Sequence, residues 1–308
     1  MKIGILGTRG IPNHYGGFEQ FAEYLSVGLV ERGHDVFCYC SKAHPYQQTT
    51  FNGVQLIHCW DPEDKIGTAG QFFYDLSCFI DARKRGFDIL LQLGYTSSSI
   101  WSHLYPSDAV VVTNMDGLEW KRSKYSAKVQ RFLKWAEKRA VRTSDFLVSD
   151  SIGIQNYLLN EYQAQSTYIP YGAEVFRTPD QEAIVSLGVE PEGYDMLIAR
   201  MEPENNIEII LDGVAMANSQ VPFLVVGNAG NRFGQYLQNK FRAVPQIRFL
   251  GAIYHMELLN NLRYYSRIYF HGHSVGGTNP SLLEAMASAK LLAAHKNEFN
   301  SSILGEEA

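Results

Sequence analysis

One stretch near the end of the sequence constrains the fold more than any other. Residues 267–294 read RIYFHGHSVGGTNPSLLEAMASAKLLAA, which is a short apolar run, a polar loop with glycines, a segment of helical character and a second apolar run. Asn279 is a residue type that caps helix N-termini, and Pro280 suits the first helical position. The loop amides and the positive end of the helix dipole would point at one place, so the pattern predicts a strand, an anion-binding loop, a helix and a strand. The pattern leaves open whether Glu284, in the first turn, faces a ligand or only stabilises its own helix.

Short apolar runs alternate with amphipathic segments along most of the chain. This alternation predicts an α/β protein with two parallel sheets, each covered by helices on both faces. The polar stretch 171–193 contains two prolines and fits a linker, so we expect domains at 1–172 and 173–308. The predicted strands are 1–7, 36–39, 54–58, 87–93, 109–113, 146–149, 168–170, 195–200, 223–227, 247–251, 268–270 and 291–294. The predicted helices are 18–32, 70–85, 123–143, 151–160, 207–218, 232–241, 256–266 and one that starts at 280.

Length and composition restrict the class of protein. A chain of 308 residues is longer than one hydrophobic core usually serves, so two domains are expected. The net charge of −5 argues against a general nucleic-acid-binding protein. The sequence shows no signal-peptide pattern and no apolar run of about 18 residues, so we expect a cytoplasmic protein without a membrane-spanning helix. The cysteines lack the spacing of a zinc site and are predicted to be buried, reduced thiols: Cys38, Cys40, Cys59 and Cys78.

The loop and helix at 274–286 resemble the signature region of the GT-B glycosyltransferases, in particular glycosyltransferase family 4. That family usually carries two glutamates eight positions apart, the second within Leu-Glu-Ala-Met. Glu284 matches the second glutamate, and the first would fall at Gly276. The sequence SVGGTNPS at 274–281 is similar to the bacterial rhamnosyltransferase branch. The resemblance covers nearly the whole chain and implies two doubly wound Rossmann-like domains that face a cleft, the first on the acceptor side and the second binding the nucleotide sugar. Beside family members, the second domain looks truncated at its C-terminus.

Two glycines before the first predicted helix form the next motif. Gly16 and Gly17 permit close approach of the backbone to a phosphate, and a simple turn is the alternative interpretation. The resemblance implies that they lie by the donor diphosphate. A nicotinamide site at Gly4, Gly7 and Gly10 is disfavoured, because the spacing is not Gly-x-Gly-x-x-Gly and the second strand ends without an acidic residue.

The segment ARMEPENN at 199–206 resembles the family segment in which an arginine and a lysine clamp the donor diphosphate. Arg200 matches the arginine, and its planar fork suits a phosphate. The lysine position is Asn205, which carries no charge. The alternative for Arg200 is an ion pair with Glu202 or Glu204.

The segment NMDGLEWKR at 114–122 is also similar to the rhamnosyltransferase branch. The resemblance implies that Asp116 accepts the acceptor's proton or orients the sugar, whereas a solvated turn with a helix cap is the alternative. Histidines beside the loops are more often structural than catalytic. The predicted catalytic residues are Asp116, Arg200 and Glu284. The predicted donor-binding residues are Gly16, Gly17, Asn205, Gly227, Gly251, His273, Gly277, Thr278, Asn279 and Ser281, and the predicted acceptor-binding residues are His14, Glu119 and Arg122.

A basic segment at 121–142 has an apolar stripe on one side. One face suits packing on the sheet, and the other suits contact with anionic lipid head groups at the inner face of the membrane. A solvated charged face is the alternative.

The resemblance, together with these features, implies a retaining glycosyltransferase of surface polysaccharide synthesis. The resemblance implies transfer of a sugar, rhamnose from dTDP-rhamnose, from a nucleotide-sugar donor to a glycan or lipid-diphosphate acceptor, with no metal and no cofactor. Two alternatives stay open: a sugar-nucleotide epimerase of the same fold, and a catalytically weakened protein that only binds a nucleotide sugar. The sequence leaves the donor base, the acceptor and the linkage undetermined.

Overall fold

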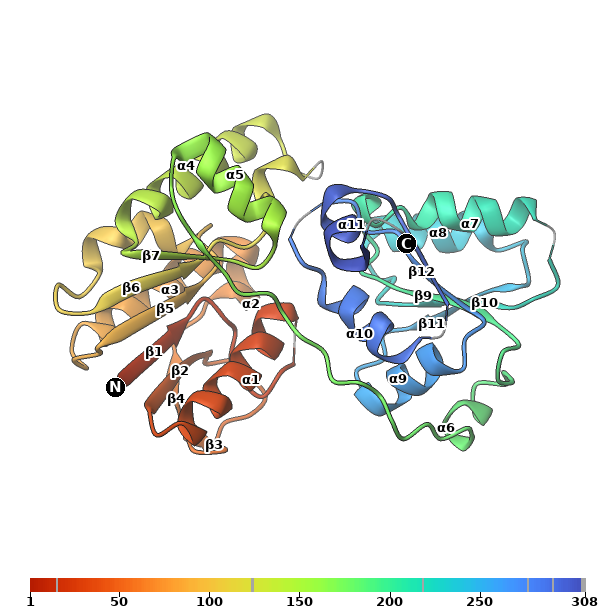
Figure 1. Ribbon diagram of the computed structural model, residues 1–308, viewed down its shortest axis with the longest axis horizontal. Helices are drawn as coiled ribbons and strands as arrows, with labels where there is room; N and C mark the ends of the chain where they lie inside the picture. Colours follow the sequence, from red (N-terminus) through yellow and green to blue (C-terminus); the bar gives the residue numbers. More distant parts are fainter. Residues whose placement is uncertain (15, 123–124, 218, 276, 290, 306–308) are drawn as a thin grey trace. The chain divides into compact units, whose positions relative to one another are not determined.

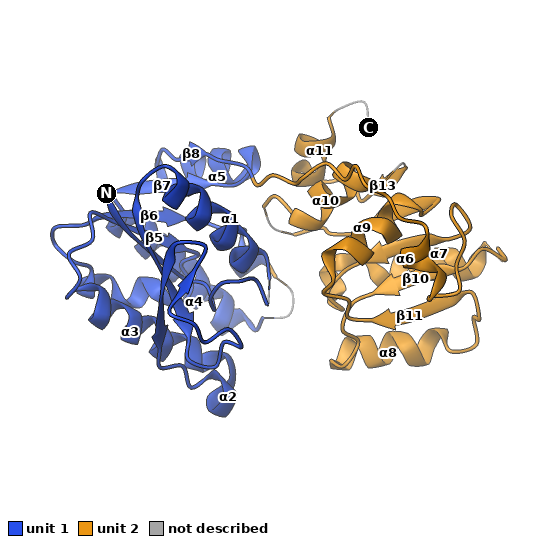
Figure 2. Ribbon diagram, turned by 90° about the horizontal axis from the view of Figure 1, so that it is seen from below, with its two compact units in different colours: residues 1–121, 125–170 blue, residues 122–124, 171–308 orange. Residues whose placement is uncertain are grey.

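The chain forms two compact units, coloured separately in Figure 2. The computed structural model describes residues 1–14, 16–122, 125–217, 219–275, 277–289 and 291–305. Unit 1 comprises Met1–Lys121 and Tyr125–Pro170, and unit 2 comprises Arg122–Lys124 and Tyr171–Ala308. The boundary expected from the sequence lies two residues later, and no sequence pattern indicated that Arg122 clusters with unit 2.

Unit 1 is built around an eight-stranded sheet with the order β3-β4-β2-β1-β5-β6-β7-β8 (Figure 1). Neighbouring strands are parallel except for β3 and β4. The strands are β1 (Lys2–Leu6), β2 (Asp35–Ser41), β3 (Thr50–Phe51), β4 (Val54–Cys59), β5 (Ile89–Leu93), β6 (Val110–Asn114), β7 (Phe146–Ser149) and β8 (Thr167–Tyr168). The helices are α1 (Gly17–Glu31), α2 (Glu63–Ile66), α3 (Gly70–Ala82), α4 (Ala127–Thr143) and α5 (Ile152–Tyr162), with 3-10 turns η1 (Gly67–Ala69), η2 (Ser98–Leu104) and η3 (Glu119–Lys121).

The two faces of this sheet bury separate cores. Side chains alternate along a strand, so Phe37 and Tyr39 of β2 pack on the α3 side, whereas Cys38 and Cys40 pack on the α1 side. The four cysteines are buried and free, as the sequence predicted. Sheet and helices therefore form three layers.

Unit 2 repeats the arrangement on a smaller scale. Its five parallel strands have the order β11-β10-β9-β12-β13, and cores lie on both sides of the sheet. The strands are β9 (Asp195–Ile198), β10 (Phe223–Val226), β11 (Ile247–Gly251), β12 (Ile268–His271) and β13 (Leu292–Ala294). The helices are α6 (Glu182–Val185), α7 (Ile207–Met216), α8 (Arg232–Phe241), α9 (Met256–Tyr264), α10 (Pro280–Ser288) and α11 (Glu298–Leu304), with a 3-10 turn η4 (Pro203–Asn205).

In each unit the direction of strand addition reverses once. In unit 1, β2 and β4 extend the sheet on one side of β1, and β5 then pairs with the other side of β1. In unit 2, β10 and β11 lie on one side of β9, and β12 pairs with the other. Open α/β sheets bind ligands beyond the carboxyl ends of their strands at such a switch point. The loops after β1 and β5, and those after β9 and β12, are therefore where ligand sites are expected.

Several predicted elements differ at their ends. Helix α4 begins at Ala127, because Ser126 caps it by accepting a hydrogen bond from Val129 N at 3.5 Å. The predicted start of this helix at 123 lies outside the described residues. Some short elements were not predicted from the sequence, notably α2, α6 and α11. Of the helices in the described part of the chain, none is both long and apolar enough to cross a bilayer.

Candidate active site

The loops after β9 and β12 of unit 2 are held together by polar contacts, and we call residues 199–206 and 271–274 the clasp. Asn206 Nδ2 donates to the carbonyl of Gly272 at 2.8 Å. Ser274 donates through both its backbone N–H (3.0 Å) and its hydroxyl (2.7 Å) to the carbonyl of Glu204. Gly272 allows this approach, since a Cβ there would lie 2.2 Å from the carbonyl oxygen of Asn205. The clasp fixes both loops at the switch point of unit 2.

Asn205 joins the two predicted ligand-binding groups within the clasp. Its Nδ2 donates to the carbonyl of Arg200 at 2.7 Å, and its Oδ1 accepts from His273 Nδ1 at 2.7 Å. This arrangement places the ring proton of neutral His273 on Nδ1 and leaves Nε2 as an acceptor. Asn205 thus orients His273, a role that the sequence did not predict.

His273 is largely buried and lies near two arginines and one glutamate. Burial, together with the charges of Arg122 and Arg200, lowers the pKa of His273 to about 4, although the charge of Glu204 acts in the opposite direction. Burial also lowers the pKa of the neighbouring His271 to about 3, with a contribution from His273. Both rings are therefore neutral near pH 7. A place that disfavours imidazolium because two guanidinium groups are near is one that favours an anionic ligand.

Arg200 extends from the carboxyl end of β9 and is exposed. Within the described part of the chain it has no ion pair with Glu202 or Glu204, the alternative raised from the sequence. Glu204 instead lies 3.5 Å from Arg122, and both of these side chains are largely buried. The structure thus brings Arg122, predicted as an acceptor-binding residue, beside the Arg200 loop.

The loop before α10 carries the remaining predicted donor-binding residues. Asn279 caps α10 by accepting from Ser281 N at 2.9 Å, and Pro280 occupies the first turn, as predicted. The Ser281 hydroxyl is hydrogen-bonded to Tyr269 Oη at 2.9 Å. Thr278 is buried, and Gly277 is partly exposed beside it. Gly276, the expected position of the first family glutamate, lies outside the described residues.

Glu284 faces a buried cation. It forms an ion pair with Arg263 of α9, whose side chain is 1% exposed, and Glu284 itself is 14% exposed. Arg263 also donates to Asn260 Oδ1 at 2.9 Å. The carboxylate therefore neutralises a buried guanidinium, which sequence reasoning did not foresee.

Two further predicted glycines have backbone reasons for being glycine. Gly227 has a φ of +153°, and a Cβ there would lie 2.0 Å from the carbonyl oxygen of Ala199. Gly251 has a φ of +77° and its carbonyl accepts from Gly227 N at 2.8 Å. Both lie at the carboxyl ends of strands of unit 2; close packing accounts for Gly227, whereas the positive φ alone accounts for Gly251, around which there is open space.

In unit 1 the loop after β1 leads into an uncapped helix. Gly16 is the N-cap of α1 and offers no side-chain hydrogen bond, so amides of the first turn stay open to an anion. Glu19 is buried and accepts from Arg9 N at 2.8 Å and from the Thr8 hydroxyl at 3.3 Å, which holds the loop in place. Gly17 is exposed at the helix start. Exposed His14 lies in the same loop, its ring centroid 6.3 Å from that of His44.

The loop after β6 holds Asp116 in an uncommon backbone conformation. Its φ is +50°, which aspartate tolerates better than most residues, and its N–H is bonded to Asn114 Oδ1 at 3.1 Å. Glu119 follows in η3. The proposed role of Asp116 towards the acceptor stays a prediction.

Sequence reasoning missed several residues that build the site. Asn297, the N-cap of α11, and Asn300, within α11, both donate to the carbonyl of His273, at 2.9 and 3.0 Å. The presence of two asparagines close together was the only sequence feature that could have indicated this role, and no pattern indicated that their partner is His273. Glu204, Asn206 and Ser274 stood inside quoted motifs without an assigned role.

Residues 1–174 match the family model described as "Domain of unknown function (DUF1972)". The match covers more than half of the chain. The chain belongs to this DUF1972 family. No curated protein matches it at a significant level.

Solved structures share the fold of this DUF1972 protein. Sucrose-phosphate synthase from Thermosynechococcus elongatus is 17% identical with a TM-score of 0.75, over 95% of this chain and 80% of that one. HepE from Anabaena, in complex with UDP and glucose, is 17% identical with a TM-score of 0.77, over 99% and 83%. An alpha,alpha-trehalose 6-phosphate synthase from Burkholderia multivorans is 12% identical with a TM-score of 0.65, over 98% and 85%. The predicted fold, two Rossmann-like domains of the GT-B glycosyltransferase type, is thereby confirmed.

Proposed function

We propose that this protein is a glycosyltransferase that takes its sugar from a nucleotide-sugar donor. The observation that carries the proposal is the clasp, which brings Arg200 and neutral His273 to the switch point of unit 2 in a chain with the GT-B fold. HepE, which shares the fold, was solved with UDP-glucose and with UDP. A nucleoside diphosphate is the anion that fits this place in such a fold.

The diphosphate would be held by charge and by backbone dipoles. Arg200 provides a planar fork for a phosphate, and Arg122 lies near it in an ion pair with Glu204 at 3.5 Å. Stabilising the departing diphosphate is the largest catalytic effect that such a site can provide.

The step we propose retains anomeric configuration. The bond between the sugar C1 and the donor phosphate oxygen breaks, and the acceptor hydroxyl oxygen bonds to C1 from the same face. The hydroxyl proton passes to the departing phosphate oxygen, so no carboxylate acts as nucleophile. Asp116 would orient the acceptor, with His14 and Glu119 as further contacts. The proposal involves neither a metal ion nor a cofactor.

The donor and acceptor follow from the resemblance of residues 274–281 to the rhamnosyltransferase branch. We propose dTDP-rhamnose as donor and a glycan or lipid-diphosphate as acceptor, within surface polysaccharide synthesis. Peripheral contact with the inner face of the membrane is proposed for α4. Trp135 is 48% exposed there between exposed Arg131 and Lys138, and tryptophan among cations suits a lipid interface.

The test measures binding of a panel of nucleoside diphosphates and sugar transfer from the corresponding nucleotide sugars. Arg200→Ala should lower transfer by about tenfold or more, because one charged hydrogen bond to the diphosphate is lost. Glu284→Ala should also lower it. Arg242→Ala is the control, since Arg242 is an exposed arginine of the same unit outside the clasp.

Three outcomes separate the alternatives. Wild-type turnover in Arg200→Ala would remove the proposed site. Isomerised donor in the absence of acceptor would indicate an epimerase. Tight nucleotide binding without transfer to any acceptor would indicate a nucleotide-sugar-binding protein.

A further inference from the structure

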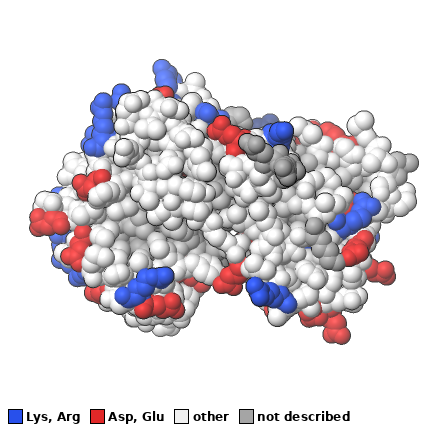
Figure 3. Space-filling model, viewed as in Figure 1, with Lys and Arg blue, Asp and Glu red and all other residues white. Residues whose placement is uncertain are grey.

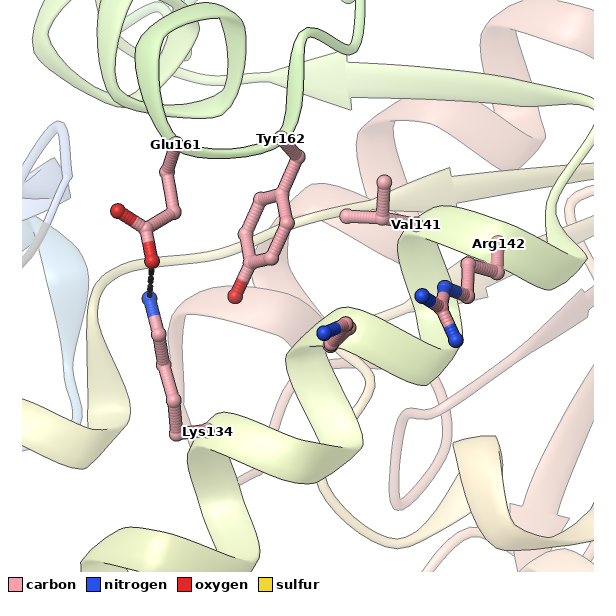
Figure 4. A pocket seen from close by; sticks show the side chains of 6 residues that line it. Lys134, Val141, Arg142, Glu161 and Tyr162 are labelled. Carbon is pink, nitrogen blue, oxygen red and sulfur yellow. Dashed lines mark ion pairs between the residues drawn. The ribbon is translucent and has the colours of Figure 1, made fainter.

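A pocket in unit 1, separate from the clasp and from the predicted donor- and acceptor-binding residues, lies between α4 and the end of α5 (Figure 4). Its volume is about 430 Å³, which is within the range of small-molecule sites. Figure 4 shows Glu161 and Tyr162 extending from α5 towards α4, with Lys134, Val141 and Arg142 on α4. The lining residues are Lys134, Lys138, Val141, Arg142, Glu161 and Tyr162.

The cations of the pocket follow from the spacing on α4. Lys134, Lys138 and Arg142 are four residues apart, so they lie on one side of the helix in successive turns. Lys134 is neutralised, because it pairs with Glu137 at 3.2 Å and with Glu161 at 3.1 Å. Within the described part of the chain, neither Lys138 nor Arg142 has an ion-pair partner. The pocket therefore has two uncompensated positive charges about one helical turn apart.

The wall behind these cations is rigid. Buried Glu137 accepts hydrogen bonds from Tyr157 at 2.6 Å, Tyr162 at 2.5 Å and Tyr95 at 3.2 Å. Burial alone would lower the pKa of Lys134, but its hydrogen bonds to Tyr157, Tyr162 and Glu161 outweigh burial and raise it. Lys134 and Tyr162 are thus fixed before any ligand arrives, which lowers the entropic cost of binding.

The chemistry of the lining residues restricts the class of ligand that the pocket can bind. Two adjacent cations match a phosphoryl group. The Tyr162 ring and Val141 add an apolar wall, and the volume exceeds what one small anion needs. On the face drawn in Figure 3, Lys and Arg side chains stand in small groups on a mainly uncharged surface, so discrete sites are favoured there over a continuous basic face.

We propose that the α4–α5 pocket is a binding site for an organic phosphate, held by Lys138 and Arg142 with its organic part against Tyr162 and Val141. The phosphoryl group belongs either to a soluble phosphate ester or to a lipid head group. The site is independent of the clasp, so it stands whether or not the proposed transferase activity is found.

The test uses the full chain and two probes. Glycerol 3-phosphate in solution represents the soluble ester, and phosphatidylglycerol vesicles, compared with phosphatidylcholine vesicles, represent the lipid. The double variant Lys138→Ala/Arg142→Ala removes the charges, and Val141→Trp fills the pocket without changing charge. Arg83→Ala is the control, because Arg83 is an exposed arginine of the same unit, directly after α3, and does not line the pocket.

Both pocket variants should weaken binding of the responding probe by about tenfold or more, and Arg83→Ala by less than about twofold. Response to glycerol 3-phosphate identifies a soluble ester, and response to phosphatidylglycerol alone identifies a lipid head group. Full binding in Val141→Trp would show attraction to the surface of α4 rather than entry into the pocket and would overturn the proposal. Lack of binding by the folded wild-type chain to either probe would overturn it as well.

Discussion

At the scale of single residues, the clasp depends on a position that has no room for a side chain. Gly272→Ala should destabilise the protein by about 1–3 kcal/mol, because its Cβ would lie 2.2 Å from the carbonyl of Asn205. Gly213→Ala should instead stabilise by about 0.5–1 kcal/mol, since Gly213 lies within α7 with open space around it. Urea denaturation of both variants measures the contrast. Equal effects of the two substitutions would contradict the close approach.

The two buried histidines predict a loss of stability in acid. Their pKa values in the folded chain are about 4 for His273 and about 3 for His271, below the 6.5 of the free side chain. The unfolded chain therefore takes up protons first as pH falls. The stability that each contributes is intact above about pH 6.5 and should fall by about 2 kcal/mol between pH 7 and pH 5.

Unfolding free energies of His273→Gln and His271→Gln at pH 7, 6 and 5 test this. Each variant should show a shallower decrease than the wild type. His295→Gln, an exposed histidine of the same unit, should follow the wild type. A wild-type curve that is flat over this interval would contradict the assigned burial.

Sequence reasoning located individual residues better than their partners. Asn279 was predicted as a helix cap and is one, because capping depends on local sequence. The ion pair of Glu284 with Arg263 and the contact of Arg122 with Glu204 join residues 21 and 82 positions apart. Such pairs depend on how helices and loops pack, which local patterns do not encode. The ligand roles of the predicted site residues stay predictions.

At the scale of elements, strong hydrophobic periodicity gave most strands and helices within a few residues. The missed elements are short: α2 and α6 have four residues each, and β3 has two. Such segments contain too few residues for a period to show, and tertiary packing decides their conformation. Helix α11, with seven residues, belongs to the same class and supports the candidate site.

Helix α11 should stabilise the clasp through the side-chain amide of Asn300. Asn300 is buried and donates to the carbonyls of His273 and His295 at 3.0 and 2.8 Å. Asn300→Ala leaves these carbonyls without that donor and should cost about 1–3 kcal/mol and weaken nucleotide binding. Exposed Ser302→Ala on the same helix should change stability by less than about 0.5 kcal/mol. Denaturation and nucleotide titration together check both effects, and an Asn300→Ala variant as stable as Ser302→Ala would remove this role.

At the scale of the molecule, each unit has its own sheet, cores and switch point, so a ligand should leave a local signature. UDP or dTDP should slow amide hydrogen exchange at 199–206 and 272–279, because these loops surround the proposed diphosphate position. Strand β11 and helix α8 serve as internal references. Protection confined to unit 1 would contradict the assignment of the donor to unit 2.

The two-unit α/β architecture was predictable because strand and helix periods alternate along the whole chain. The strand order was not, since the sequence does not reveal on which side of β1 or β9 a later strand pairs. Strand order decides which loops are neighbours and hence where the clasp forms. The loops of the candidate site could therefore be predicted, but the contacts between them could not.

Every strand of the first sheet comes from residues before 169 and every strand of the second from residues after 194, as far as the chain is described. A hybrid spliced within 171–194, with its second half taken from another GT-B protein, would therefore keep each sheet's ladder of hydrogen bonds complete. Exchanging halves in this way offers a route to assign sugar preference and acceptor preference to separate parts of the gene.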